Sequence, residues 1–293
     1  MQAPQAHEQT KAQQTPATYN YERFQPSTLG QDVKLVMSSP GPLPGDMAPD
    51  FALQDIDGNT WRLSELRGQP VVLIFGSGTC PMTTGSLPGL NALHQERGHD
   101  GVQWLLLYVR EAHPGEEMPA HQSIEQKNQQ ARRLRDEDGV AWPILVGELD
   151  GATHSQYTEL PNHLFLIDTE GRVAFRSEFA HAPTLWRALN QLEARGWLGP
   201  VDEGVDKTMH MVGPTAYGWT GPSRGGKTAI NDLVKGAPPL AANLWLGQFM
   251  RPMLAPIAAR SRPLPPGAKF GLAVAALGLA AITVSMLNRR DPD

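Results

Sequence analysis

The only cysteine of the chain, Cys80, follows directly on a short apolar run. Five consecutive apolar residues, 71–75, are typical of a strand that is buried on both faces of an α/β sheet. A helix that begins just after Cys80 would place its N-terminus beside the sulfur and favour the thiolate, which is the nucleophilic form. A free cysteine is also often a small buried core residue. Residues 77–79 are small and polar and make a poor core segment, so the pattern favours a reactive thiol.

A second set of reactive side chains ends the next apolar run, 102–109, and consists of Tyr108, Glu111 and His113. Neighbouring strands of such a sheet end at the same edge, so we expect Glu111 and His113 to approach Cys80. A histidine near a thiol can take or return a proton, and a carboxylate can fix its tautomer. The pattern therefore predicts that Glu111 orients His113, although a solvated loop could carry the same residues. His121, taken alone, is typical of a surface residue.

Pro161 directly precedes a third apolar run, residues 164–167. In a thiol-redox sheet of this order, that position often carries a cis proline that faces the reactive cysteine. A proline at the start of a strand is also explained simply by its missing N–H group.

The stretches between these residues predict the elements that position them. In chain order they predict a hairpin, a buried strand, a helix after Cys80, a second buried strand, a polar helix, a short strand, a second hairpin and a closing amphipathic helix over residues 183–195. This order predicts an α/β fold, a mixed central sheet with flanking helices and an N-terminal β-hairpin.

Composition restricts the chemistry further. The chain has 293 residues, a formal net charge of −5 and one cysteine. One cysteine excludes an intramolecular disulfide, a Cys-rich zinc site and an internal resolving thiol. We therefore expect no metal and no bound cofactor, and an external thiol as the reductant. The lack of a basic excess argues against a nucleic-acid partner.

The composition also divides the chain. Residues 1–44 are rich in Gln, Pro, Thr and Ala, and predict a disordered arm that docks by its aromatic residues. The arm has no secretory signal pattern, which places the folded domain, residues 45–198, in the cytoplasm. Residues 199–269 are rich in Gly and Pro and predict a linker, with an interfacial helix over 240–259.

Residues 270–287 form a run without any charged side chain. At ~1.5 Å per residue the run reaches ~27 Å, barely the thickness of a bilayer core. It predicts a single-pass C-terminal anchor in the cytoplasmic membrane, with the catalytic domain on the cytoplasmic side. A buried core helix is the alternative.

Residues 221–228 match the phosphate-binding pattern GxxxxGK[ST]. The pattern needs a buried strand before it and an apolar strand that ends in a magnesium ligand elsewhere in the sheet. Neither accompanies it here, so we interpret the match as coincidental.

Four blocks, at residues 75–81, 108–113, 121–125 and 163–167, together resemble the thioredoxin superfamily, and within it the iodothyronine deiodinase family. The resemblance covers about residues 45–198. It implies a thioredoxin-like fold in which Cys80 stands in the place of selenocysteine as the nucleophile. Ser77, Thr79 and Tyr108 would then line the site, and Glu111, His113 and His121 would form a proton-transfer cluster.

Three departures from that family affect the expected chemistry. A cysteine replaces selenocysteine and is the weaker nucleophile at neutral pH, because its thiol is mostly protonated. Gly78 stands where the family has a further cysteine, which removes a resolving partner. His163 stands where the family has an arginine, which leaves the contact with a substrate carboxylate or hydroxyl open.

Together these observations predict a thiol-dependent oxidoreductase with one reactive cysteine. Its substrate would be a small-molecule oxidant, as in a 1-Cys thiol peroxidase, or a halogenated aromatic, as in deiodinase-like reductive dehalogenation. An external thiol or a redoxin would reduce it again. The alternative is a non-catalytic redoxin-fold module that binds a partner at the membrane. A homodimer is compatible with either prediction.

Overall fold

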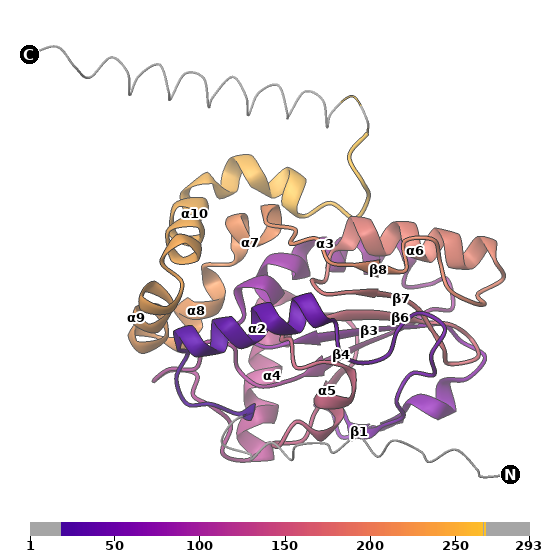
Figure 1. Ribbon diagram of the computed structural model, residues 1–293, viewed down its shortest axis with the longest axis horizontal. Coiled ribbons are helices and arrows are strands. Elements are labelled where there is room, and N and C mark those ends of the chain that lie inside the picture. Colours follow the sequence, from indigo (N-terminus) through magenta and orange to yellow (C-terminus); the bar gives the residue numbers. More distant parts are fainter. Residues whose placement is uncertain (1–18, 266, 268–293) are drawn as a thin grey trace, which may run out of the picture. The chain divides into compact units, whose positions relative to one another are not determined.

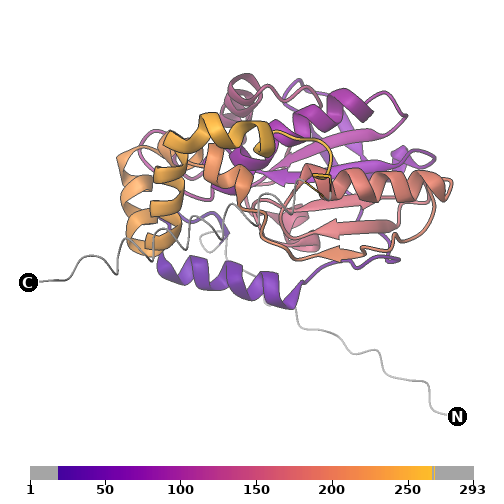
Figure 2. The same cartoon turned by 90° about the horizontal axis from the view of Figure 1, so that it is seen from above.

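The structure, a computed structural model, describes residues 19–265 and 267. The chain divides into a compact unit, residues 1–261, and a second unit, residues 262–293; all elements named below belong to the first unit. Figures 1 and 2 show two perpendicular views. The strands are β1 (Ala52–Gln54), β2 (Thr60–Arg62), β3 (Val71–Gly76), β4 (Gln103–Tyr108), β5 (Ile144–Val146), β6 (Leu164–Ile167), β7 (Val173–Ser177) and β8 (Val205–Asp206). The helices are α2 (Pro26–Ser38), the 3-10 helix η1 (Leu63–Leu66), α3 (Pro81–Arg97), α4 (Ile124–Asp138), α5 (Ala152–Tyr157), α6 (Ala182–Ala194), α7 (Val212–Tyr217), α8 (Thr220–Gly225), α9 (Lys227–Gly236) and α10 (Pro238–Ala258).

Six strands form the central sheet, in the order β5-β4-β3-β6-β7-β8. Strands β3, β4 and β5 run parallel, whereas β6 is antiparallel to β3 and to β7. The first two strands, β1 and β2, form a separate antiparallel hairpin. This is the mixed, thioredoxin-like α/β fold that the sequence predicted.

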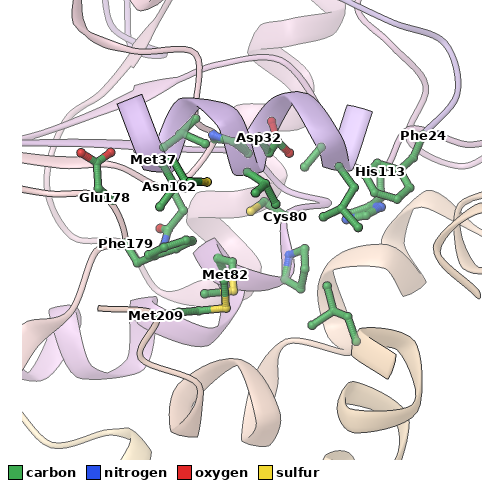
Figure 3. A pocket seen from close by; sticks show the side chains of 18 residues that line it. Phe24, Asp32, Met37, Cys80, Met82, His113, Asn162, Glu178, Phe179 and Met209 are labelled. Atoms are coloured by element: carbon green, nitrogen blue, oxygen red, sulfur yellow. The ribbon is translucent and has the colours of Figure 1, made fainter. Parts of the chain in front are cut away.

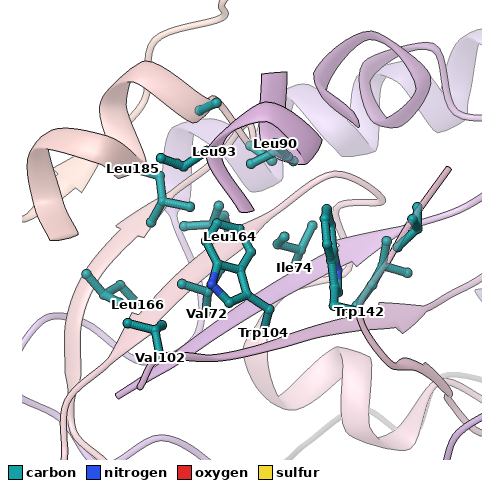
Figure 4. Close-up of a cluster of buried hydrophobic side chains, with 14 of the residues drawn as sticks. Val72, Ile74, Leu90, Leu93, Val102, Trp104, Trp142, Leu164, Leu166 and Leu185 are labelled. Atoms are coloured by element: carbon teal, nitrogen blue, oxygen red, sulfur yellow. The ribbon is translucent and has the colours of Figure 1, made fainter. Parts of the chain in front are cut away.

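The two faces of the sheet carry two separate cores, because successive side chains of a strand point to opposite faces. On β3, Val72 and Ile74 join a core that is completed by leucines of α3 and α6 (Figure 4). Leu73 and Phe75 join the second core, which the hairpin and Tyr157 of α5 cover. The strand is buried on both faces, as its uninterrupted apolar run predicted.

The described part of the N-terminal arm is ordered, which corrects the prediction of a disordered arm. Helix α2 begins at Pro26, a residue suited to the first helical turn. Tyr19 and Phe24 before it are buried, and Phe24 packs with Leu233 and Leu244 of the C-terminal helices. The predicted docking by aromatic residues is therefore confirmed. The gain from burying these rings is what offsets the entropy of ordering a polar segment.

Residues 199–261 do not form a linker, which corrects a second prediction. They add β8 to the sheet and then form α7, α8, α9 and α10. The glycines that suggested flexibility instead permit close helix contacts. A Cβ at Gly85 of α3 would lie 2.4 Å from the backbone nitrogen of Pro214 in α7, and a Cβ at Gly213 would lie 2.4 Å from the Gly85 carbonyl oxygen.

The helix begins directly after Cys80, as predicted, and contains an internal proline. It starts at Pro81, so Pro88 lies inside it, beyond its first turn. A proline there removes one intrahelical hydrogen bond. Leu87, Leu90 and Leu93 are all fully buried beside it, which compensates for that loss.

The predicted anchor, residues 270–287, lies outside the described residues. Among the residues that the structure does describe, no helix is long and apolar enough to cross a membrane.

Candidate active site

Cys80 is the N-cap residue of α3, directly after the loop that follows β3. Its side chain is buried, with 2% of its surface exposed. Burial raises the pKa of the Cys80 thiol, because a thiolate is poorly solvated there. Hydrogen bonds from the Thr83 hydroxyl and from the backbone N–H groups of Thr83 and Met82 act in the opposite direction but do not outweigh burial. In this arrangement the thiol is therefore protonated at neutral pH.

A cavity of about 240 Å³ lies against the thiol. Figure 3 shows Cys80 beneath α2, with Met82 and Met209 on the side away from that helix. Most of its lining is apolar, and the polar groups are few. The lining residues are Phe24, Leu29, Asp32, Val33, Val36, Met37, Cys80, Pro81, Met82, Ala112, His113, Leu160, Pro161, Asn162, Glu178, Phe179, Met209 and Leu240.

Three distant parts of the chain thus build one site. The thioredoxin-like domain supplies Cys80 and the strand ends, the N-terminal segment supplies α2 as a cover, and the C-terminal segment supplies Met209 and Leu240. The cover residues were missed from the sequence. The only signal for them was the Tyr19, Tyr21 and Phe24 cluster, since α2 itself lacks any chemical motif.

Glu111 is buried behind the cysteine loop, where it binds Thr79 rather than His113. Its carboxylate accepts hydrogen bonds from the Thr79 backbone N–H (2.8 Å), from the Thr79 hydroxyl (2.6 Å) and from the Tyr108 hydroxyl. Thr79 binds Oε2, whereas Tyr108 binds Oε1, and His121 Nε2 lies 3.4 Å from that same Oε1. Burial opposes ionisation, but the contacts with His121, Thr79 and Tyr108 hold the pKa of Glu111 below its ordinary value. The carboxylate therefore fixes the backbone one residue before Cys80.

His113 lines the cavity, but Glu111 does not orient it, so the predicted Glu111–His113 pair is wrong. The His113 ring packs against Phe24, with ring centroids 4.4 Å apart, and its backbone N–H donates to the Thr79 hydroxyl. Among the described residues its Nδ1 has no hydrogen-bond partner. Burial, reinforced by the nearby charge of Arg110, lowers the pKa of His113 to about 4. The imidazole is therefore neutral at pH 7.

His121 is buried, so the prediction from its local sequence that it lies at the surface is wrong. Its ring lies against Tyr108, with centroids 5.8 Å apart, and its Nε2 faces Glu111. The family resemblance grouped His121 with Glu111, and the structure brings these two together. The backbone of residue 121 is also fixed by Asn20 of the N-terminal segment.

The other predicted site residues divide between the cavity and its surroundings. Pro161 lines the same cavity as Cys80, but its peptide bond is trans, as are all those in the described residues, so the predicted cis proline is wrong. Ser77 and Thr79 are buried in the loop before Cys80, and Tyr108 is buried at the end of β4; none of the three lines the cavity. His163 is fully buried, and its Nδ1 lies 3.2 Å from Glu178. Burial lowers the pKa of His163 well below its ordinary value.

Arg110 fastens the cover to the domain. Its guanidinium lies over the Tyr21 ring at 4.9 Å, donates to the Tyr21 hydroxyl at 3.0 Å, and lies 3.5 Å from Asp32 of α2. The Tyr21 hydroxyl in turn donates to the carbonyl oxygen of Ala112, next to His113. A charged group thus holds the N-terminal segment at the edge of the site.

Residues 221–228, which match the phosphate-binding pattern, pack against the backbone of the active site. A Cβ at Gly221 would lie 2.9 Å from the carbonyl carbon of Cys80, and one at Gly225 would lie 2.5 Å from the carbonyl oxygen of His113. The N-terminus of α9 is capped by the carboxylate of Glu116, which accepts from the backbone N–H groups of Lys227 and Thr228. The chain's own carboxylate therefore occupies the place that a phosphate would take.

No group of three or more His, Cys, Asp or Glu side chains within the described residues could hold a metal ion. The cavity offers a thiol, a neutral imidazole and a mostly apolar wall, together with the carboxyl groups of Asp32 and Glu178 and the amide of Asn162.

Part of this chain is similar to known proteins. Residues 44–176 match the AhpC/TSA family. Two curated proteins, both named thiol-disulfide oxidoreductase ResA, are similar over 129 residues: one from Geobacillus kaustophilus at 29% identity and one from Geobacillus thermodenitrificans at 27%. The match covers 44% of this chain and 66% of each relative. Among solved structures, a putative thiol:disulfide interchange protein DsbE from Chlorobium tepidum is 23% identical, with a TM-score of 0.42, over 54% of this chain and all of that one.

Proposed function

We propose that the protein is a thiol-dependent oxidoreductase that uses Cys80 as its single reactive sulfur. The observation that carries the proposal is the position of this thiol, at the N-terminus of α3 and in the wall of a mostly apolar cavity. The AhpC/TSA match and the name of the ResA relatives support thiol redox chemistry. A Cys-X-X-Cys motif would need its second cysteine at Thr83, so an external thiol has to complete the cycle.

The cavity favours a small, largely apolar substrate. A thiol with 2% exposure beneath α2 cannot meet a folded protein partner unless that helix moves. Phe24, Met37 and Phe179 offer apolar contacts, and His113 and Asn162 offer polar ones. An organic hydroperoxide or a halogenated aromatic meets this description, and the two remain alternative substrates of the same proposal.

The chemistry balances with two molecules of an external thiol reductant in each cycle. With a hydroperoxide, the Cys80 thiolate attacks the terminal oxygen, the O–O bond breaks, the alcohol leaves with a proton, and a sulfenic acid forms. With a halogenated aromatic, the thiolate takes the halogen, the ring carbon gains a proton, and a sulfenyl halide forms. One external thiol then displaces water or hydrogen halide to give a mixed disulfide. A second releases the Cys80 thiol and an external disulfide.

The closed site holds both partners of the proton transfer in their uncharged forms, a protonated thiol and a neutral imidazole. Both pKa shifts have burial as their largest cause. Water that enters when α2 is displaced would lower the pKa of the thiol and raise that of the imidazole. His113 would then accept the thiol proton and return it to the leaving group.

The test offers purified full-length protein and a thiol reductant to cumene hydroperoxide, an iodinated phenol and a small disulfide in parallel. Reductant consumption gives the rate, and mass spectrometry identifies the Cys80 adduct. We expect turnover with at least one of the first two, abolished in Cys80→Ser. His113→Ala should lower the rate by about 10²–10⁴-fold. Turnover that persists in Cys80→Ser would refute the proposal.

A second candidate function is a non-catalytic binding module, and the burial of the thiol favours it. In that case none of the three oxidants would be consumed and Cys80 would stay unmodified while the fold is intact. The same experiment therefore decides between the two functions.

A further inference from the structure

Helix α10 packs on the domain by one narrow stripe. Ala241, Leu244 and Gly247, spaced by three residues, are buried on this stripe. The contact is close, since a Cβ at Gly247 would lie 2.0 Å from the carbonyl oxygen of Thr215 in α7. This stripe fixes the orientation of α10 and so determines which of its residues face outward.

The outward face of α10 is strongly apolar. Trp245, Leu246, Phe249 and Met253 expose 53%, 56%, 64% and 75% of their surface. Their spacing places them on one side of the helix, and the rings of Trp245 and Phe249 touch, with centroids 5.2 Å apart. Figure 2 shows α10 at the periphery of the described fold. Large apolar residues that gather on one exposed face mark an interaction surface, whereas scattered ones would not.

The charged residues in the sequence around α10 are all basic. Between Asp232 and Asp291 the chain has no acidic residue, whereas it has seven basic ones: Lys235, Arg251, Arg260, Arg262, Lys269, Arg289 and Arg290. This excess stands in a chain whose formal net charge is −5. The excess favours a negatively charged partner for α10 and its flanks.

We propose that the face of α10 formed by Trp245, Leu246, Phe249 and Met253 lies on an anionic lipid bilayer. An amphipathic helix with aromatic and aliphatic side chains on one side buries that side at the headgroup boundary, and nearby cations strengthen the binding. A second copy of the chain is the less suitable occupant, because two such segments would bring their positive charges together. Eleven residues separate the end of α10 from the uncharged run at 270–287, which the sequence predicts to be a membrane anchor.

The test measures the depth of one side chain rather than binding alone, because residues 270–287 could bind lipid by themselves. Full-length protein is mixed with vesicles of equal parts phosphatidylglycerol and phosphatidylcholine, the latter brominated in its acyl chains to quench tryptophan. We expect quenching in the unmodified protein and loss of most of it in Trp245→Phe. The control variant, Trp61→Phe in the hairpin, should keep it. Purely zwitterionic vesicles should bind at least about tenfold more weakly.

Equal quenching in Trp245→Phe and in the unmodified protein would overturn the proposal, since the helix would then not touch lipid. Failure to bind anionic vesicles would overturn it as well. A dimer in sedimentation that dissociates in Phe249→Glu, without any lipid quenching, would assign the face to a second copy instead. None of these outcomes depends on the chemistry of Cys80.

Discussion

Substituting Glu111 by Gln should destabilise the protein by removing the charge that holds the cysteine loop. The carboxylate accepts two hydrogen bonds from Thr79 and one from Tyr108, and it faces His121. Glu111 and its three partner residues are all buried, so no water can replace a lost hydrogen bond. The glutamine is nearly isosteric, and its one carbonyl oxygen can keep only part of this set.

The size of the effect follows from the bonds that are lost. A hydrogen bond to a charged group contributes about 1.5–3 kcal/mol, and breaking a buried charged network costs about 3–5 kcal/mol. Because the amide retains one acceptor, we expect a loss of about 3 kcal/mol in the free energy of unfolding at pH 7. Glu117→Gln is the matched control, since Glu117 is exposed, and it should change stability by less than about 0.5 kcal/mol.

The pH dependence provides an independent check. The pKa of Glu111 is lower in the folded chain than its ordinary value, so its ionisation adds stability above pH ~4.5. That stability is lost as the pH falls through the folded pKa. The gap between the original protein and Glu111→Gln should therefore narrow on acidification. Urea unfolding at pH 7 and in mild acid, followed by circular dichroism, measures both values.

A change of less than about 0.5 kcal/mol in Glu111→Gln at pH 7 would refute this reasoning. So would a deficit that stays constant as the pH falls, because the contribution would then not come from the ionised carboxylate.

Three further predictions follow from the site. Burial raises the pKa of Cys80, so its alkylation by iodoacetamide should reach half its maximal rate above the ~8.5 of a free thiol; a midpoint below pH 7 would contradict the closed site. Gly221→Ala should lower the free energy of unfolding, measured by thermal denaturation, by about 1–3 kcal/mol, because the added Cβ would meet the Cys80 backbone. Gly30→Ala, where a Cβ meets open space, should not destabilise the protein. Equal effects would mean that α8 does not pack against Cys80 as described. Glu116→Gln should lower the melting temperature, because Glu116 caps the N-terminus of α9, whereas Lys227→Ala should leave it unchanged. If calorimetry shows nucleotide binding that disappears in Lys227→Ala, residues 221–228 are a phosphate site and this prediction is wrong.

Local sequence determined the parts of this protein that depend on a few neighbouring residues. The apolar run at 71–75 could only be a strand buried on both faces, and the polar loop after it had to bring Cys80 to the edge of the sheet. The order of strands and helices determined the mixed sheet, because parallel and antiparallel connections need different lengths of chain. Thus the fold and the central residue of the site were readable from local patterns.

Only the tertiary structure decided which side chains meet. Spacing along one strand end suggested that Glu111 would orient His113, but the strand end turns them apart, and Glu111 faces His121 and Thr79 instead. The cover over Cys80 was equally unreadable, because α2 and the C-terminal helices meet through Phe24, more than 200 residues from Leu233 in sequence. Composition gives only the average polarity of the N- and C-terminal segments. Their glycines suggest a flexible linker unless it is known that a neighbouring helix packs closely against them. The accessibility of the thiol, and hence its pKa, is therefore a property of the assembled fold.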